Sequence, residues 1–190
     1  AAKFDEMEEA SKSELQKAQE KAAHLQEKLS KMEKAAMPSL GTCSMMGTAN
    51  TMSCLAEVLG LTLPGCATAL AVSAEKKRFA KRSGIRIMEM YRENLTPRKI
   101  VTKEALEDAI AASMAMGGST NSVLHLMAFA HEAGVKLELN DFDRISRKVP
   151  YICNIKPSGQ YALADLDDAG GMPAVLKTIE PHLAQDHLTV

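Results

Sequence analysis

The stretch 41–52 constrains the fold more than any other part of the chain, because it places a glycine-rich loop directly before an apolar helical pattern. Its sequence, GTCSMMGTANTM, combines two glycines, a cysteine and small hydroxyl residues. The glycines permit close backbone approach, and Thr48 or Asn50 can cap the helix that follows. Free amides at the start of that helix favour anionic ligands, and Cys43 lies where such a loop presents a thiolate. The stretch therefore predicts a site loop that leads into a helix.

Glycines and hydroxyl caps divide the rest of the chain into further helices, with little extended structure. Thr102 precedes an apolar pattern that Gly117 and Gly118 end, which predicts a helix over 103–116. Extended structure is predicted only at 135–139, where apolar residues alternate, and at 149–155, around Pro150. Other helices are predicted at about 49–59, 67–90, 120–134, 141–147 and 173–179. The predicted fold class is mainly α with two or so short strands.

The first 36 residues contain no glycine or proline and are rich in Ala, Glu, Lys and Gln. Ser11 and Glu14 have the spacing of a capping box, so a helix is expected over 11–36. Its apolar stripe recurs every three or four residues, at Leu15, Ala18, Ala22, Leu25, Leu29, Met32 and Ala36. The stripe packs on its own domain or forms a coiled-coil or dimer contact. Since 37–39 break the helix, we expect an amphipathic helical segment at 1–36 and a second domain at 37–190.

Composition excludes several classes of protein and partner. The 190 residues, 46% of them hydrophobic, can bury a core, and 23 basic against 24 acidic residues offer no global attraction to nucleic acid or membranes. No apolar run approaches the roughly 18 to 20 residues of a membrane helix. The four cysteines are widely spaced without a Cys-x-x-Cys pair, as is typical of reduced intracellular thiols. We expect the cytoplasm or an organelle interior, with no nucleic-acid or membrane partner.

Several segments in one order resemble a known family, and the likeness covers roughly 37–183. Besides the loop around Cys43, they are 60–65 (GLTLPG), 117–126 (GGSTNSVLHL), 156–159 (KPSG) and 170–175 (GGMPAV). The family is that of the iron–sulfur dihydroxyacid dehydratases and their sugar-acid and 6-phosphogluconate dehydratase relatives. The resemblance implies that residues 37–190 are part of the α/β cluster-binding N-terminal domain of such an enzyme.

By this resemblance, Cys43 is the third cysteine ligand of an iron–sulfur cluster that keeps one iron open for substrate. The family's other two ligands lie upstream, one of them in a Cys-Asp-Lys motif that helps to hold magnesium, and neither is in this sequence. Iron–sulfur cluster and Mg²⁺ are thus expected in the parent enzyme but not assembled by this chain alone. We expect Cys43 to be accessible, and Cys54, Cys66 and Cys153 to be buried small hydrophobes. Met45 stands where relatives usually carry glycine.

A second candidate site lies at the corner between two predicted helices. Ser119, Thr120 and Asn121 follow a glycine pair and precede a helix N-terminus, an arrangement that can cradle a carboxylate or phosphate. The alternative is a helix corner with ordinary caps at Ser119 or Thr120. The spacing leaves both interpretations open.

The resemblance implies a fragment of a lyase that converts 2,3-dihydroxy acids to 2-oxo acids in branched-chain amino-acid synthesis. The expected catalytic serine lies in a C-terminal domain outside this sequence, so we expect no catalytic residue here and no activity from the chain alone. The parent is expected to be a homodimer with a small dihydroxy acid as substrate. A sugar-acid or 6-phosphogluconate dehydratase fragment is one alternative. A non-catalytic helical interaction module, using the stripe at 15–36, is an alternative of another class.

Overall fold

The computed structural model describes residues 16–29, 43–184 and 187–190, and the chain divides into two units, Ala1–Pro38 and Ser39–Val190. In the first unit, residues 16–29 are helical and exposed, which confirms the predicted helix over that range. The predicted cap at Ser11 and Glu14 and the end of that helix at 30–36 lie outside the described residues.

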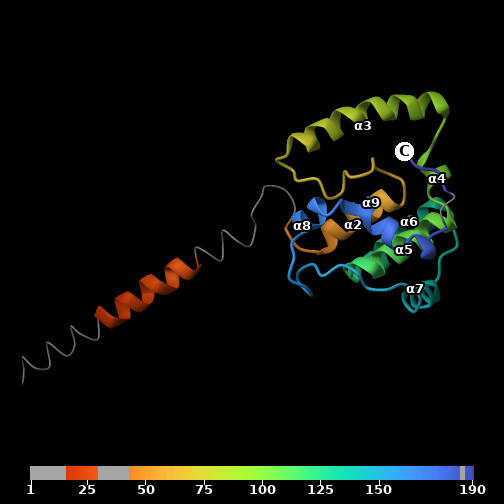
Figure 1. Ribbon diagram of the computed structural model, residues 1–190. Helices are drawn as coiled ribbons and strands as arrows, with labels where there is room; N and C mark the ends of the chain where they lie inside the picture. The colour runs from red at the N-terminus through yellow and green to blue at the C-terminus, as the bar shows by residue number, and fades with distance from the viewer. Residues whose placement is uncertain (1–15, 30–42, 185–186) are drawn as a thin grey trace, which may run out of the picture. The chain divides into compact units, whose positions relative to one another are not determined.

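The second unit is built almost entirely from helices (Figure 1). In chain order they are α2 (Thr48–Val58), α3 (Ala74–Glu93), α4 (Pro97–Ile100), α5 (Lys103–Met116), α6 (Asn121–Ala133), α7 (Leu139–Ser146), α8 (Leu163–Asp168), α9 (Gly171–Thr178) and the short 3₁₀ helix η1 (Glu180–His182). No described helix combines the length and the apolar character that crossing a membrane requires.

Helix α5 lies at the centre of the second unit and has the bounds that its caps predict. The Thr102 side chain accepts a hydrogen bond from the amide of Ala105, and Gly117 ends the helix at φ +65° in the left-handed region. Ala occupies many positions of α5, so neighbouring helices approach closely. They are α2, α6, α7 and α9.

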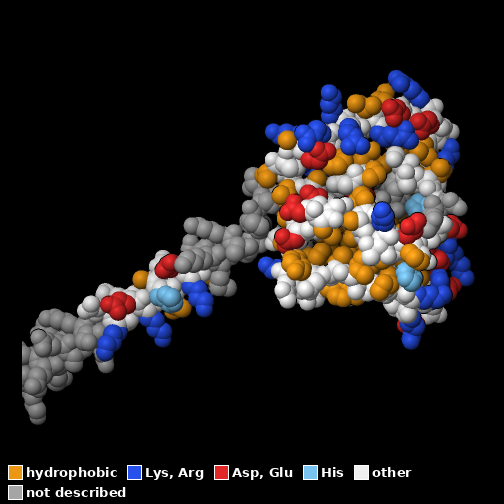
Figure 2. Space-filling view, viewed as in Figure 1, with side chains coloured by type: hydrophobic (Ala, Val, Ile, Leu, Met, Phe, Trp, Pro, Cys, Tyr) orange, Lys and Arg blue, Asp and Glu red, His pale blue; other side chains and the backbone are white. Residues whose placement is uncertain are grey.

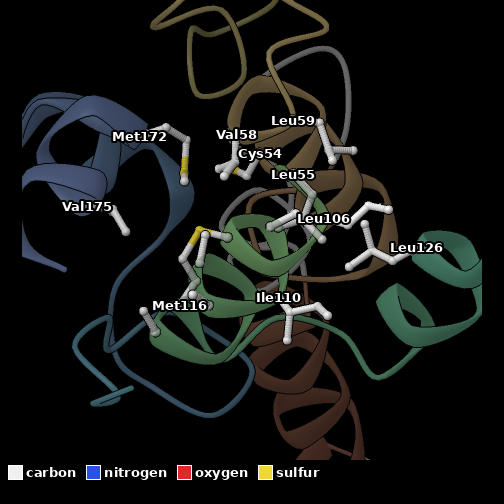
Figure 3. Packing of buried hydrophobic residues seen from close by; sticks show 14 of the residues in the cluster. Cys54, Leu55, Val58, Leu59, Leu106, Ile110, Met116, Leu126, Met172 and Val175 are labelled. Carbon is white, nitrogen blue, oxygen red and sulfur yellow. The ribbon is translucent and has the colours of Figure 1, made fainter. Parts of the chain in front are cut away.

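The core forms where α2, α6 and α9 meet α5 (Figure 3). Leu55 and Leu59 of α2 are fully buried and point toward Leu106 of α5. Met172 of α9 and Leu126 of α6 close the cluster on either side. Burying such side chains contributes roughly 1.5–3 kcal/mol each, so this cluster is the main source of the unit's stability.

Helix α3 begins at Ala74, seven residues after its predicted start at 67. Ser73 is its cap and accepts a hydrogen bond from the amide of Lys76. The residues before it form turns because the buried carboxylate of Glu57 accepts bonds from the amides of Gly65 (2.6 Å) and Ala67 (2.9 Å). These amides therefore have a tertiary acceptor in place of a helical one. Figure 2 shows Lys and Arg side chains along the outer edge of α3.

The predicted strands do not form among the described residues, which contain only one isolated bridge, between Ile155 and Tyr161. Leu139 begins helix α7 where the alternating pattern predicted a strand. At 150–155 the chain is extended, but the amides of Ile152 and Cys153 donate to the carbonyl of Ala115 at the end of α5. A helix end therefore occupies the donors that a partner strand would need.

Candidate functional site

The Cys43 loop is fixed from two sides. Gly47 is the N-cap of α2 and makes no side-chain cap, so the prediction that Thr48 or Asn50 caps this helix is wrong. Asn50 instead reaches back into the loop and donates from its Nδ2 to the carbonyls of Cys43 (2.5 Å) and Met45 (2.6 Å). The loop thus has a defined backbone, held by the helix that it precedes.

A later part of the chain holds the other side of this loop. The amide of Met46 donates to the carbonyl of Lys156 at 2.7 Å, and the amide of Leu163 donates to the carbonyl of Ser44 at 2.8 Å. Lys156 begins the KPSG segment at 156–159. Two segments far apart in sequence therefore form one loop pair.

The glycine corner between α5 and α6 packs directly on α2. A Cβ at Gly118 would lie 2.7 Å from the Ser113 hydroxyl and 2.9 Å from a methyl of Thr51, so glycine is required by the close approach. The amide of Ser119 donates to the hydroxyl of Thr51 at 3.0 Å. Thr51 is fully buried, so this bond is shielded from water.

Beside this contact, side chains from the two helix starts form a small polar network. The Thr48 and Ser119 hydroxyl oxygens are 3.2 Å apart, and Asn121 Nδ2 donates to the Thr48 hydroxyl at 2.7 Å. Ser119 also accepts from the amide of Asn121 at 3.3 Å, while Thr120 is exposed and makes no side-chain cap. The N-termini of α2 and α6 thus meet, which brings the two candidate sites of the sequence together.

The backbone amides at the start of α6 already have acceptors. Those of Ser122 and Val123 donate to the carbonyls of Ser119 and Thr120, and that of Asn121 donates to a hydroxyl. A ligand at this corner therefore has side-chain groups available rather than a free row of amides. The N-cap of α6 is Thr120, which makes no side-chain cap bond, and the Ser119 hydroxyl accepts from the amide of Asn121. Binding of an anion at this corner stays a prediction.

The four thiols lie in different surroundings. Cys43 is half-buried and its Sγ lies 3.8 Å from the carbonyl oxygen of Met45, whereas Cys54 is fully buried. Burial raises the pKa of Cys54 to about 12, and burial also raises that of Cys153. The expectations of an accessible Cys43 and a buried Cys54 and Cys153 are confirmed.

The expectation for Cys66 is wrong, because this thiol is only half-buried. It follows the turn at Gly65, and Lys76 Nζ lies 3.7 Å from its Sγ and 2.6 Å from its carbonyl oxygen. Cys66 therefore lies between the polar contact with Lys76 and the small apolar cluster of Leu63, Ala69 and Phe79. This half-buried thiol away from the Cys43 loop is a matched control for experiments on Cys43.

In the described part of the chain, no three His, Cys, Asp or Glu side chains come together in a group that could hold a metal ion. Cys43 is a half-buried free thiol on a loop held by hydrogen bonds from Asn50. Met45 is 40% exposed, and a Cβ built on Gly47 would lie 3.5 Å from its methyl and 3.8 Å from Cys43 Sγ.

Three residues of this region were not assigned to the site by the sequence analysis: Thr48, Asn50 and Thr51 as groups that join its two parts. The hydrogen bonds of Thr48 and Thr51 to the corner span 68 to 73 residues of sequence, so no local pattern could reveal them. Asn50 instead bonds to the Cys43 loop, five and seven residues earlier. The available signal was the polarity of Asn50 and Thr51 within an otherwise apolar helix. Buried polar residues at a helix start need partners, and here these are the two site loops.

Comparison with known proteins agrees with this arrangement. The family model described as "Dihydroxy-acid/6-phosphogluconate dehydratase N-terminal" matches residues 3–190. The dihydroxy-acid dehydratase of Ignicoccus hospitalis is 56% identical over 153 residues, 80% of this chain and 28% of the relative. Those of Endomicrobium trichonymphae and Methanosarcina barkeri are 52% and 51% identical over 84% and 85% of this chain, and 29% of each relative.

The chain therefore spans less than a third of the length of the curated relatives it matches. Within that span, the conclusion from the sequence segments agrees with the comparison, because the family model covers almost the whole chain. The chain belongs to the dihydroxy-acid/6-phosphogluconate dehydratase family and corresponds to its N-terminal domain.

Proposed function

We propose that this chain is part of a dihydroxyacid dehydratase and that Cys43 is one cysteine ligand of its iron–sulfur cluster. The observation that carries the proposal is the joining of the Cys43 loop to the Ser119–Asn121 corner through the first turn of α2. A half-exposed thiol thereby lies in the same small region as a set of hydrogen-bonding side chains. A reaction that removes water from a dihydroxy acid needs both kinds of group.

The reaction removes the proton at C2 and the hydroxyl at C3 of a 2,3-dihydroxy acid, and the resulting enol tautomerises to the 2-oxo acid. When bound, an iron–sulfur cluster with one open iron supplies a Lewis acid for the departing hydroxyl. In this proposal Cys43 binds the cluster as a thiolate. Thr120 and Asn121 donate hydrogen bonds to the substrate carboxylate, and Ser119 and Thr48 hold Asn121 in place.

The remaining parts of the proposed site come from outside the described residues. A single cysteine cannot hold a cluster, so further thiolate ligands, the magnesium ligands and the base that takes the C2 proton belong elsewhere in the parent. We accordingly expect the 190-residue chain to bind no stable cluster and to show no turnover. Turnover by the isolated chain above a control without protein, abolished by Cys43→Ala, would contradict this.

The activity is tested in the full-length parent, purified without oxygen and assayed with 2,3-dihydroxy-3-methylbutanoate. We expect formation of the 2-oxo acid, loss of at least about a thousandfold in kcat with Cys43→Ala, and near wild-type activity with the matched Cys66→Ala. Full activity of Cys43→Ala would overturn the ligand assignment.

The same assay with 6-phosphogluconate and with a sugar acid separates the alternatives within the family. The relatives at 48–56% identity are named dihydroxy-acid dehydratases, which favours the branched-chain substrate. If the parent prefers 6-phosphogluconate, the proposed substrate is wrong, but the proposed reaction class, a dehydration by a lyase, still holds. Family membership favours an enzyme over a non-catalytic helical module.

The polar corner has its own test. Asn121→Ala removes both the amide group and the bond to Thr48, so we expect kcat/KM to fall about tenfold or more while the iron content of the parent stays unchanged. Thr120→Val removes an exposed hydroxyl and should raise KM by less than about tenfold. Unchanged kinetics in both variants would leave the corner with only the structural role of a cap.

We also propose a reducing compartment, the cytoplasm or an organelle interior, and a homodimer for the parent. Four free cysteines in the described residues support the first proposal. Light scattering of the purified parent tests the second, and a monomer at micromolar concentration would contradict it.

A further inference from the structure

We propose that Asn50 is the residue that positions Cys43 for its ligand, an inference that rests on the proposed role of Cys43 in cluster binding. Asn50 lies in the first turn of α2 and is 1% exposed. Its amide nitrogen has two hydrogens and lies within bonding distance of two carbonyl oxygens, those of Cys43 and Met45. One buried side chain thus spans both ends of the Cys43–Met45 turn.

The chemistry of the acceptors determines which residue can do this. Both partners are carbonyl oxygens, which only accept, so the side chain must supply two donors from one atom. Among side chains of this length only asparagine does so without a charge. Aspartate has the same shape but would set carboxylate oxygens against both carbonyls, and alanine would leave the carbonyls without this partner.

Two separate sets of hydrogen bonds hold the Cys43 loop. Backbone bonds to Lys156 and Leu163 hold Met46 and Ser44, respectively, whereas Asn50 donates to the carbonyls of Cys43 and Met45. Of these two sets of bonds, the one from Asn50 acts directly on the carbonyl of Cys43. A group that fixes the orientation of a metal ligand without touching the metal typically changes metal affinity by about 10- to 100-fold.

Thr51 provides a matched control because it is the next residue and equally buried. Its hydroxyl accepts from the amide of Ser119 and makes no bond to the Cys43 loop in the described structure. Thr51→Val keeps the shape and removes only that acceptor. Asn50→Ala and Thr51→Val therefore each remove one buried polar group from the same turn, but they release different loops.

The first measurement is amide hydrogen exchange in the 190-residue chain. Asn50→Ala should accelerate exchange of the Met46 and Gly47 amides about tenfold and leave exchange of the Ser119 amide unchanged. Thr51→Val should accelerate exchange of the Ser119 amide and leave that of Met46 and Gly47 unchanged. If Asn50→Ala does not fold by circular dichroism, the isosteric Asn50→Asp takes its place with the same expectation. Unchanged exchange at Met46 and Gly47, or equal acceleration by both variants, overturns the proposal.

The second measurement uses the full-length parent and follows the loss of its visible cluster absorbance to an iron chelator. Asn50→Ala should lose iron about tenfold faster than wild type, and Thr51→Val should lose it at the wild-type rate. Equal rates for wild type and Asn50→Ala overturn the positioning role. If wild-type parent never acquires a cluster, the proposed function fails, and the exchange pattern alone then decides whether Asn50 holds the Cys43 loop.

Discussion

Helix α5 buries ten of its 14 residues, whereas the longer α3 buries only two of its 20, Phe79 and Met90. Both helices begin at a hydroxyl cap whose side chain accepts an amide bond, and both end at a left-handed residue, Asn94 in α3 and Gly117 in α5. End signals therefore determine where a helix forms, and side-chain size and charge determine whether other helices pack around it.

The surroundings of the two helices differ accordingly. The small side chains of α5 let four helices approach it, while α3 carries Ile85, Ile87, Met88 and Tyr91 as exposed apolar side chains. A surface pocket lined by Leu63 and Ile100 opens beside α3. Substitutions in the two helices should therefore have very different effects on the free energy of unfolding.

The largest difference is expected from truncation of an apolar side chain. Leu106→Ala in α5 leaves a cavity at a fully buried position and should lower the free energy of unfolding by about 2–5 kcal/mol. Ile85→Ala in α3, where the side chain is 53% exposed, should change it by less than about 0.5 kcal/mol. Urea denaturation of the 190-residue chain measures both, and similar losses would contradict the assigned burial.

A glycine near the end of α5 gives the next largest effect. Gly118→Ala inserts a methyl group against Ser113 and Thr51, both buried, and should cost about 1–3 kcal/mol. The same variant should disturb the Ser119 amide, which NMR chemical shifts would report. Wild-type stability of Gly118→Ala would mean that the corner does not pack on α2 as closely as described.

The buried carboxylate of Glu57 adds a dependence on pH. Desolvation raises its pKa in the folded state, against the opposing effect of the Gly65 and Ala67 amides. The folded chain therefore binds more protons than the unfolded chain above about pH 4.5, and stability falls as pH rises through the folded pKa, by at most about 1.4 kcal/mol per pH unit.

The variant Glu57→Gln lacks this titration, so the stability of wild type minus that of the variant should fall as pH increases above 4.5. Denaturation curves of both proteins at several pH values give the difference. A difference that rises with pH would show that the amide bonds to the carboxylate outweigh its burial.

The smallest effect should stabilise the chain. Gly84 lies in the middle of α3, and a Cβ there would meet nothing within 4 Å, so Gly84→Ala should add about 0.5–1 kcal/mol through helix propensity alone. Gly84→Ala and Gly118→Ala are the same kind of substitution in the two regions, but they are expected to change the free energy of unfolding in opposite directions. A loss of stability in Gly84→Ala would show that α3 bends or packs at this point.

Local signals in the sequence predicted the elements whose ends they control. Thr102 and Gly117 gave the bounds of α5 correctly because a cap acts within one helical turn. The start of α3 was wrong because the amides before it bond to Glu57, a partner in another helix. The strand predicted over 135–139 was wrong because residues 135–138 have no partner strand among the described residues and the capping box of Glu138 and Asp141 starts α7 at Leu139.

The candidate site was predictable in its parts but not in its assembly. The glycine-flanked loop together with the family resemblance indicated Cys43 as a candidate, and the glycine pair indicated the corner at Ser119. Their meeting depends on Thr48 and Thr51, which contact residues about 70 positions away and carry no local mark of that contact. Tertiary contacts of single polar side chains therefore form the part of the site that sequence patterns do not contain.

The most direct test of the proposed site is the iron and labile sulfide content of the full-length parent, reconstituted without oxygen as wild type, Cys43→Ser and Cys66→Ser. Both cysteines are half-buried, but only Cys43 lies on the loop that joins the polar corner. The predicted result is a cluster in wild type and Cys66→Ser, and its loss in Cys43→Ser. Equal iron and sulfide in all three proteins would contradict the assignment of Cys43 as a ligand.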